Sequence, residues 1–212
     1  MSKALTTCLI GGFLLATNIP ATARQATPTA PQPDLKITLR VYDYAGLQAE
    51  LLDRALDGAA IILRDAGVVV EPIICTQNEP PAACRQIPDP LHIAVRIVPK
   101  PVPGADYGTL GYAAGQYITV NYSRVEKFAD RSDVYLDRIL GCVLAHELGH
   151  VLLGPDSHSA KGIMTAHLTD KELVQIRAMF IGFLPFQKAR IRAYFLAQTP
   201  ELQASAIALA QR

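Results

Sequence analysis

The chain has 212 residues, half of them hydrophobic, and a formal net charge of +1 at pH 7. This length is sufficient for one domain with a substantial apolar core. The near-neutral charge shows neither the basic footprint of a nucleic-acid-binding protein nor an acidic tail, so the composition predicts no nucleic-acid partner.

Residues 1–23 are predicted to be a signal peptide. Lys3 provides a basic start, an apolar run covers residues 4–16, and residues 21–23 (Ala-Thr-Ala) match a small-x-small cleavage site. The run is short for a membrane span. The sequence therefore predicts a secreted or periplasmic protein with no stable membrane insertion after cleavage. Retention of the segment as an N-terminal anchor is the alternative.

A linker and a single domain follow. Residues 24–34 are rich in Pro, Thr and Gln and have nothing to bury, which is typical of a linker. Residues 35–212 are expected to form one domain. The alternation of apolar and polar side chains over residues 35–41 predicts a half-buried strand, and an apolar stripe predicts a helix over residues 47–66 that Gly67 ends. Further strands are predicted at residues 68–74, 91–98, 110–113 and 117–122.

Two cysteines close a short polar loop. Cys75 and Cys84 flank a proline-containing segment, and in an oxidising compartment we expect them to form a disulfide. Closure of such a loop contributes roughly 2–3 kcal/mol on the chain-entropy model. Two free thiols are the alternative. Cys8 leaves with the signal peptide, and the apolar neighbours of Cys142 predict a buried, inert thiol.

The second half of the chain is predicted to be largely helical. A long helix is expected to start at Asp133, which can cap it, and to end at Leu153, because Gly154 and Pro155 follow. A later helix opens at Thr169, with Glu172 completing a capping box. A final helix is predicted over residues 185–197.

The long helix carries an HExxH motif. His146 and His150 lie one turn apart on the same face, and Glu147 lies beside them. Neutral imidazoles at this spacing can share one zinc ion, and zinc lowers the pKa of a bound water to about 7. Glu147 could then act as the general base for attack on a carbonyl. The motif therefore predicts a zinc hydrolase, with a chance occurrence on a surface helix as the alternative.

The segment from 146 to 164 resembles the metzincin zinc peptidases, and within them the matrixin-like group. The pattern of that family is HExxHxxGxxH followed by a methionine-containing turn. Residues 158–164 open with His-Ser and close with Ile-Met, which is similar to a third ligand followed by the Met-turn, with Met164 as its methionine. The resemblance implies an α+β fold. In that fold a small, mixed, twisted sheet packs on two helices, including the active-site helix, and a helical subdomain follows at the C-terminus.

The third ligand departs from the family spacing. The glycine of the pattern would fall at Leu153 and here is Gly154, and the third ligand would fall at Asp156. His158 lies two residues later, at the end of a lengthened loop, and its His-Ser context favours it as the ligand. Asp156 is the alternative third ligand; otherwise it orients an imidazole or is only a turn residue. Glu172 is a more remote candidate.

Together with the signal-like N-terminus, the resemblance predicts a secreted zinc endopeptidase that cleaves peptides or proteins, and we expect it to be a monomer. Zn²⁺ would be bound by His146, His150 and His158, Glu147 would be the catalytic base, and an edge strand near residues 108–114 would bind the substrate. One alternative is a catalytically inactive zinc-binding interaction protein, against which the intact Glu147 argues. Another is a metalloamidase acting on cell-wall peptides, although no wall-binding segment is recognisable.

Overall fold

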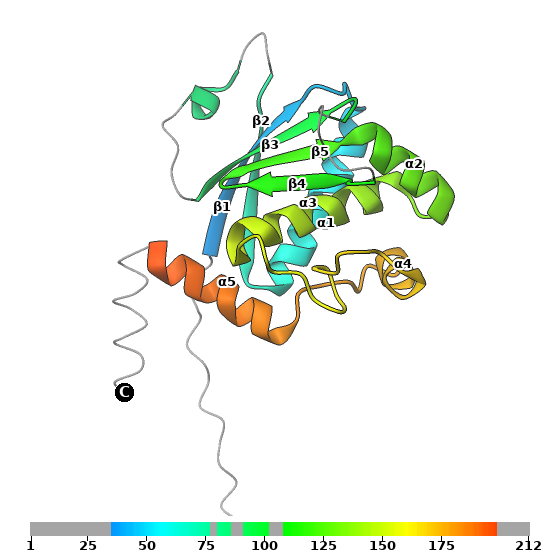
Figure 1. The fold of residues 1–212 in the computed structure, drawn as a ribbon. Coiled ribbons are helices and arrows are strands. Elements are labelled where there is room, and N and C mark those ends of the chain that lie inside the picture. The colour runs from blue at the N-terminus through cyan, green and yellow to red at the C-terminus, as the bar shows by residue number, and fades with distance from the viewer. Residues whose placement is uncertain (1–34, 77–79, 86–90, 102–107, 199–212) are drawn as a thin grey trace, which may run out of the picture. The chain divides into compact units, whose positions relative to one another are not determined.

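The computed structural model describes residues 35–76, 80–85, 91–101 and 108–198. The predicted signal peptide and linker therefore lie outside the described residues. Figure 1 shows one layer of strands with helices packed against it. Among the described helices, none is both long and apolar enough to cross a membrane.

The sheet has five strands in the order β2-β1-β3-β5-β4 (Figure 1). Three neighbouring pairs are parallel, and only β4 runs antiparallel, against β5, so β4 forms one edge of the sheet. Each strand overlaps one predicted from the sequence, and β1 is the one predicted from hydrophobic alternation. Their bounds are β1 (Leu35–Asp43), β2 (Val68–Ile74), β3 (His92–Val98), β4 (Gly111–Ala114) and β5 (Tyr117–Asn121).

Five α-helices and one short 3₁₀ helix are present in the described ranges. The predicted helix after β1, the helix with the HExxH motif and the last two helices are confirmed, including the capping box of Thr169 and Glu172. Their bounds are α1 (Ala49–Asp65), α2 (Tyr122–Ser132), α3 (Leu136–Leu153), α4 (Asp170–Arg177), α5 (Pro185–Gln198) and η1 (Ala82–Arg85).

The predicted start of the long helix at Asp133 is wrong. Asp133 has φ = +52° and ends α2, a helix that the sequence did not predict, and α3 begins at Leu136 after Tyr135. Aspartate tolerates the left-handed region better than most residues, whereas a helix N-cap needs extended backbone. The predicted end of α3 is confirmed, because Gly154 has φ = +97° and its amide bonds the His150 carbonyl.

The core lies between one face of the sheet and helices α1 and α3. Side chains at alternate positions of β1, such as Leu39 and Val41, are fully buried on this face. The two helices approach closely where Gly141 faces α1, since a Cβ at Gly141 would lie 2.8 Å from the Ala55 carbonyl oxygen. The mixed sheet packed on two helices, one of them carrying the HExxH motif, is therefore confirmed.

The predicted disulfide is present. Cys75, directly after β2, and Cys84, in η1, are bonded to each other. The Tyr42 hydroxyl is 3.5 Å from the Cys84 carbonyl oxygen, at the outer limit for a hydrogen bond between η1 and β1. Cys142 is a free and buried thiol, as predicted.

Candidate metal centre

Two imidazoles of the candidate site belong to helix α3, most of which is buried. His146 and His150 lie one turn apart, and their Nε2 atoms are 3.0 Å from each other. Apolar packing against α1 and the sheet fixes α3 on several sides, and Leu144 and Leu148, which flank the histidines, are fully buried. The two side chains are therefore held by a rigid element, which favours a preformed site.

The loop after α3 brings in the third imidazole. His158 places its Nε2 3.2 Å from the Nε2 of His150. One nitrogen of each of the three histidines lies within 4.8 Å of the others, the arrangement of a metal site. In tetrahedral zinc coordination, ligand nitrogens about 2.0–2.1 Å from the ion are about 3.3 Å apart, close to the separations seen here.

The other two candidates for the third ligand lie outside this group. Asp156 is exposed on the loop and is not one of the three clustered residues. The carboxylate of Glu172 accepts hydrogen bonds from the backbone N–H and the hydroxyl of Thr169, which are its capping-box partners. Glu172 therefore caps helix α4 and is not one of the clustered metal-binding candidates.

Hydrogen bonds behind the imidazoles orient their free nitrogens toward one another. Nδ1 of His146 is 2.8 Å from the Ile163 carbonyl oxygen, which can only accept, so Nδ1 carries the proton. In the neutral ring, Nε2 then holds a lone pair. Nδ1 of His150 is 3.1 Å from Ser157 Oγ and 3.4 Å from the Gly154 carbonyl oxygen. Converging lone pairs repel one another unless a cation lies between them, so this donor set fits a metal ion.

Burial keeps the two helical histidines neutral. It lowers the pKa of His146 to about 4, and it also lowers the pKa of His150. The neighbouring imidazoles add to both shifts, while backbone hydrogen bonds oppose them. At neutral pH these side chains are therefore in the state that binds metal.

Glu147 lies next to the histidines with one oxygen unused. Its side chain is buried, and among the described residues no hydrogen-bond partner reaches Oε2. Burial raises the pKa of its carboxyl group to about 8. A nearby divalent cation would favour the ionised form and oppose that shift. A buried carboxylate oxygen without a protein partner is suited to hold a water molecule and to accept its proton.

The edge strand β4 runs directly past Glu147. A Cβ on Gly111 would lie 2.9 Å from Glu147 Oε1, so only glycine fits at this point without displacement. A cleft of about 1050 Å³ extends between β4 and the loop that follows Met164, and the three histidines line it. His167 and Tyr112 also line the cleft. The predicted substrate strand is therefore an edge strand that borders the histidine cluster.

Met164 packs beneath the histidine helix. It is fully buried, and a Cβ on Gly149 would lie 2.2 Å from its sulfur atom. The turn is closed by a hydrogen bond from the Ser159 amide to the Met164 carbonyl oxygen. The segment between His158 and Met164 is thus a compact turn in contact with α3 next to His150.

Two residues of the site were not foreseen. Ser157 is buried behind His150, but the sequence suggested Asp156 as the residue that orients an imidazole. Gly111 was predicted only as part of the edge strand that would bind the substrate, and not as the residue that packs against Glu147. A serine in a loop and a glycine in a strand carry no signal of such roles, because both depend on how distant segments pack.

No known family model matches the sequence, and no curated protein matches it either. Among solved structures, archaemetzincin from Methanopyrus kandleri is similar with a TM-score of 0.47 and 16% identity, over 78% of this chain and 98% of that chain. A zinc-dependent peptidase from Methanocorpusculum labreanum has a TM-score of 0.48 and 16% identity, over 72% of this chain and 99% of that chain. At such distances the function has to be inferred from the residues of the site.

Proposed function

We propose that this protein is a zinc-dependent endopeptidase of metzincin type, with a lengthened, matrixin-like ligand motif. The observation that carries the proposal is the convergence of three imidazole nitrogens beside a buried carboxylate oxygen that has no partner among the described residues. Both line an open cleft bordered by an edge strand. A purely structural metal site has no need of such a carboxylate or of access from solvent.

The metal would be held by His146, His150 and His158. Three nitrogen ligands and an open fourth position are typical of catalytic zinc sites, whereas structural sites are closed by four protein ligands. When bound, zinc acts as a Lewis acid that acidifies water and polarises a substrate carbonyl. Asp156 remains the alternative third ligand if the loop after Gly154 rearranges.

Glu147 would act as the general base and then as the general acid. Its unpartnered Oε2 accepts a proton from the attacking water. The same oxygen then donates that proton to the leaving amine nitrogen, which completes cleavage of the peptide bond. Glu147 is placed for this role by α3 on one side and by the close approach of Gly111 on the other.

Strand β4 would bind the substrate backbone. Its four residues pair with β5 on one side only, and its other side borders the cleft. An extended peptide can add to such an edge through backbone hydrogen bonds, with little dependence on sequence. The scissile bond would then lie beside Glu147, near Gly111.

We further propose that the enzyme is exported and acts as a monomer in the periplasm or outside the cell. The Cys75–Cys84 disulfide supports export, because disulfides persist mainly in oxidising compartments. The signal-like residues 1–23 support it as well. Peptides or proteins in that compartment would be the substrates.

The test is digestion of casein and of a quenched fluorescent peptide library by the purified protein. We expect zinc-dependent cleavage that a chelator abolishes and zinc restores. Glu147→Gln should bind zinc as the wild type does and lose about 10²–10⁴-fold in turnover. Glu50→Gln, at the exposed start of α1, is the matched control and should retain activity.

The outcome also separates the alternatives. Zinc binding without any hydrolysis would identify an inactive zinc-binding protein and contradict the proposal. Cleavage of cell-wall peptides alone, with no cleavage of casein or of the library, would identify a metalloamidase instead. Full activity of Glu147→Gln would show that the base is another residue.

A further inference from the structure

Of the three imidazoles in the metal centre, His158 has the least support from hydrogen bonds. Nδ1 of His146 is bonded to the Ile163 carbonyl oxygen, and Nδ1 of His150 lies 3.1 Å from Ser157 Oγ. His158 is exposed, and among the described residues its ring makes hydrogen-bond or ring contacts only with the other two imidazoles. The position of this ligand therefore depends on how the backbone next to it is held.

Ser159, the residue directly after His158, is held by three hydrogen bonds. Its amide donates to the Met164 carbonyl oxygen at 2.8 Å, and its hydroxyl donates to the Lys161 carbonyl oxygen at 2.9 Å. Because the single hydroxyl proton is used in this way, Oγ can only accept a further hydrogen bond. Nε2 of Gln187, 3.2 Å away, is the donor of that bond. A side chain from the distant helix α5 thus holds the backbone next to the third ligand.

Gln187 lies in the first turn of α5 and is only 1% exposed. Its Oε1 accepts a hydrogen bond at 2.8 Å from the amide of Leu184, the residue directly before the helix. A backbone amide can only donate, so the oxygen of the Gln187 side chain faces Leu184 and its nitrogen faces Ser159. The two ends of one buried side chain therefore join the start of α5 to the loop that carries His158.

A comparison with α4 shows which part of this arrangement goes beyond helix capping. Glu172 is the third residue of α4, as Gln187 is of α5, and its carboxylate accepts a hydrogen bond from the Thr169 amide. Such a cap needs only an acceptor oxygen at this position. In α5 the NH₂ group of Gln187 adds a second bond, which leaves the helix and ends at Ser159. Capping alone does not account for that bond.

The segment that leads into α5 supports a second ligand as well. The Gly182 carbonyl oxygen accepts a hydrogen bond from the Ile163 amide at 2.9 Å. The carbonyl oxygen of the same Ile163 is the partner of His146 Nδ1 at 2.8 Å. Residues 182–187 are thus connected to two of the three imidazoles, and in each case only one residue lies between.

We propose that Gln187 is a positioning residue of the metal centre, which holds Ser159 so that His158 stays at ligand distance from the bound ion. A loop that is already ordered loses less conformational entropy when the metal binds, and groups behind the ligands commonly support metal affinity in this way. The inference rests on the metal site of the proposed function. It does not require hydrolysis, so it can be measured separately.

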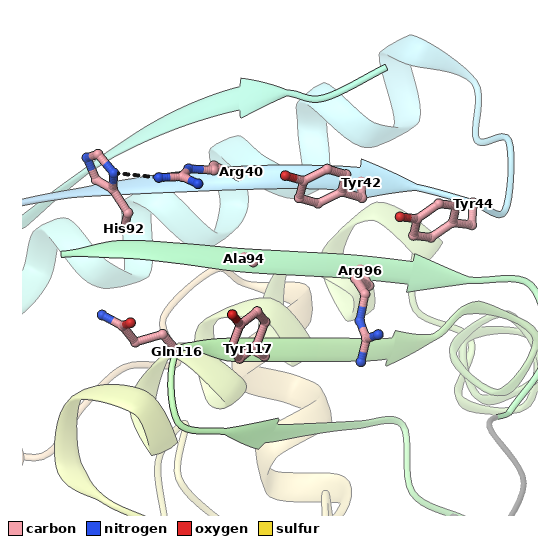
Figure 2. Close-up of a pocket in the computed structure, with 8 residues that line it drawn as sticks. All are labelled: Arg40, Tyr42, Tyr44, His92, Ala94, Arg96, Gln116 and Tyr117. Carbon is pink, nitrogen blue, oxygen red and sulfur yellow. Dashed lines mark hydrogen bonds between the residues drawn. The ribbon is translucent and has the colours of Figure 1, made fainter. Parts of the chain in front are cut away.

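The first test is zinc affinity, measured by competition with a fluorescent chelator. Gln187→Met keeps a side chain of similar length but removes both hydrogen bonds, so we expect zinc to bind about tenfold more weakly. Gln116→Met is the matched control, because Gln116 lines a separate hollow over strands β1, β3 and β5 (Figure 2) and not the cleft of the metal centre. It should bind zinc as the wild type does. Equal affinities of Gln187→Met and the wild type would overturn the proposal.

The second test reads the geometry at the ion, which a change in stability alone would not alter. Cobalt(II) can take the place of zinc, and its visible absorption spectrum depends on the geometry of its ligands. At saturating cobalt, we expect Gln187→Met to give a spectrum different from that of the wild type, because His158 is no longer held in one position. Weaker metal binding with an unchanged spectrum would show that Gln187 acts only on the stability of the fold, and would overturn the proposal.

Variants of Ser159 assign the effect to its bond with Gln187. Ser159→Ala removes the acceptor but leaves the bond between Leu184 and Gln187 in place, so it tests the same link if Gln187→Met does not fold. In the Ser159→Ala background, Gln187→Met should weaken zinc binding by less than about twofold more, although it should still lower the midpoint of urea unfolding. Ser159→Thr keeps the hydroxyl and should keep the affinity. Two full, additive losses in the double variant would overturn the proposal.

Peptide cleavage, measured on the same proteins, separates this inference from the proposed function. Zinc binding that depends on Gln187, without any hydrolysis by the wild type, would support the inference and contradict the peptidase. Cleavage by the wild type, with zinc affinity and cobalt spectrum unchanged in Gln187→Met, would overturn the inference and leave the peptidase intact. A wild type that does not bind zinc would contradict both.

Discussion

Ser157 places its hydroxyl oxygen 3.1 Å from Nδ1 of His150, on the side of the ring that faces away from the other two histidines. The contact is a product of the lengthened loop after Gly154, which turns Ser157 inward, leaves Asp156 exposed and brings His158 to the cluster. The extra residues of the loop thus complete the site in two ways. They supply the third imidazole and a partner for the second.

We predict that Ser157→Ala weakens zinc binding by about tenfold, because the His150 ring loses a hydrogen bond that orients it. Competition with a fluorescent chelator measures the affinity. Ser132→Ala, at the end of α2, removes a hydroxyl that bonds only the Ala129 carbonyl oxygen among the described contacts and should leave zinc affinity unchanged. Equal affinities in Ser157→Ala and the wild type would show that the Ser157 contact does not support the metal site.

Gly149→Ala should destabilise the protein by about 1–3 kcal/mol, the usual cost of overpacking a core. The added methyl would lie 2.2 Å from the Met164 sulfur atom and 3.0 Å from Phe183, and both are buried. Urea denaturation of the metal-free protein measures the change. Gly58→Ala is a matched helical control, because its nearest atoms would be 3.9 Å away, and it should be neutral or stabilising. Equal stabilities of the two variants would contradict the packing of α3 on Met164.

Gly111→Ala should reduce turnover about 100-fold while zinc content stays the same. The new methyl would lie 2.9 Å from Glu147 Oε1 and 3.1 Å from a methyl carbon of Val143, so either β4 or the carboxylate has to move. Small displacements of a catalytic group are costly on this scale. Steady-state kinetics with parallel metal analysis provide the test, and an unchanged kcat would contradict the placement of Glu147 against the edge strand.

Cys142 should not react with iodoacetamide in the folded protein at pH 8. Burial raises the pKa of its thiol to about 12, so the reactive thiolate is scarce, and the sulfur is also shielded from solvent. Mass mapping of labelled peptides should find modification of Cys142 only after denaturation. Rapid labelling of the native protein would show that the thiol faces the cleft in an open state.

Helices and strands could be predicted from the sequence where the pattern of residues within the element itself specifies it. Alternation predicted β1 because its inward side chains pack on the helices, and the Thr169–Glu172 capping box is a purely local signal. Helix α2 was missed because it follows β5 without a loop. Its end at Asp133 depends on a left-handed residue that also resembles an N-cap in sequence.

The residues of the candidate site also fall into two groups, those that the sequence predicts and those that it does not. Helical periodicity alone places His146, Glu147 and His150 together, because their spacing is set within one element. The third imidazole, Ser157 and Gly111 depend on the path of a loop and on strand packing, which sequence patterns do not encode. The alignment of Arg40, Ala94 and Tyr117 across three strands likewise depends on the strand register, which sequence patterns do not encode.

The most direct test of the central claim is the coordination of zinc in a crystal of the zinc-loaded protein, located by anomalous diffraction at the zinc edge. The account predicts one zinc ion with the Nε2 atoms of His146, His150 and His158 about 2.0–2.1 Å away, and Glu147 beside it but outside the ligand set. A carboxylate oxygen of Asp156 or Glu172 at ligand distance in place of His158, or a fourth protein ligand that closes the site, would contradict it.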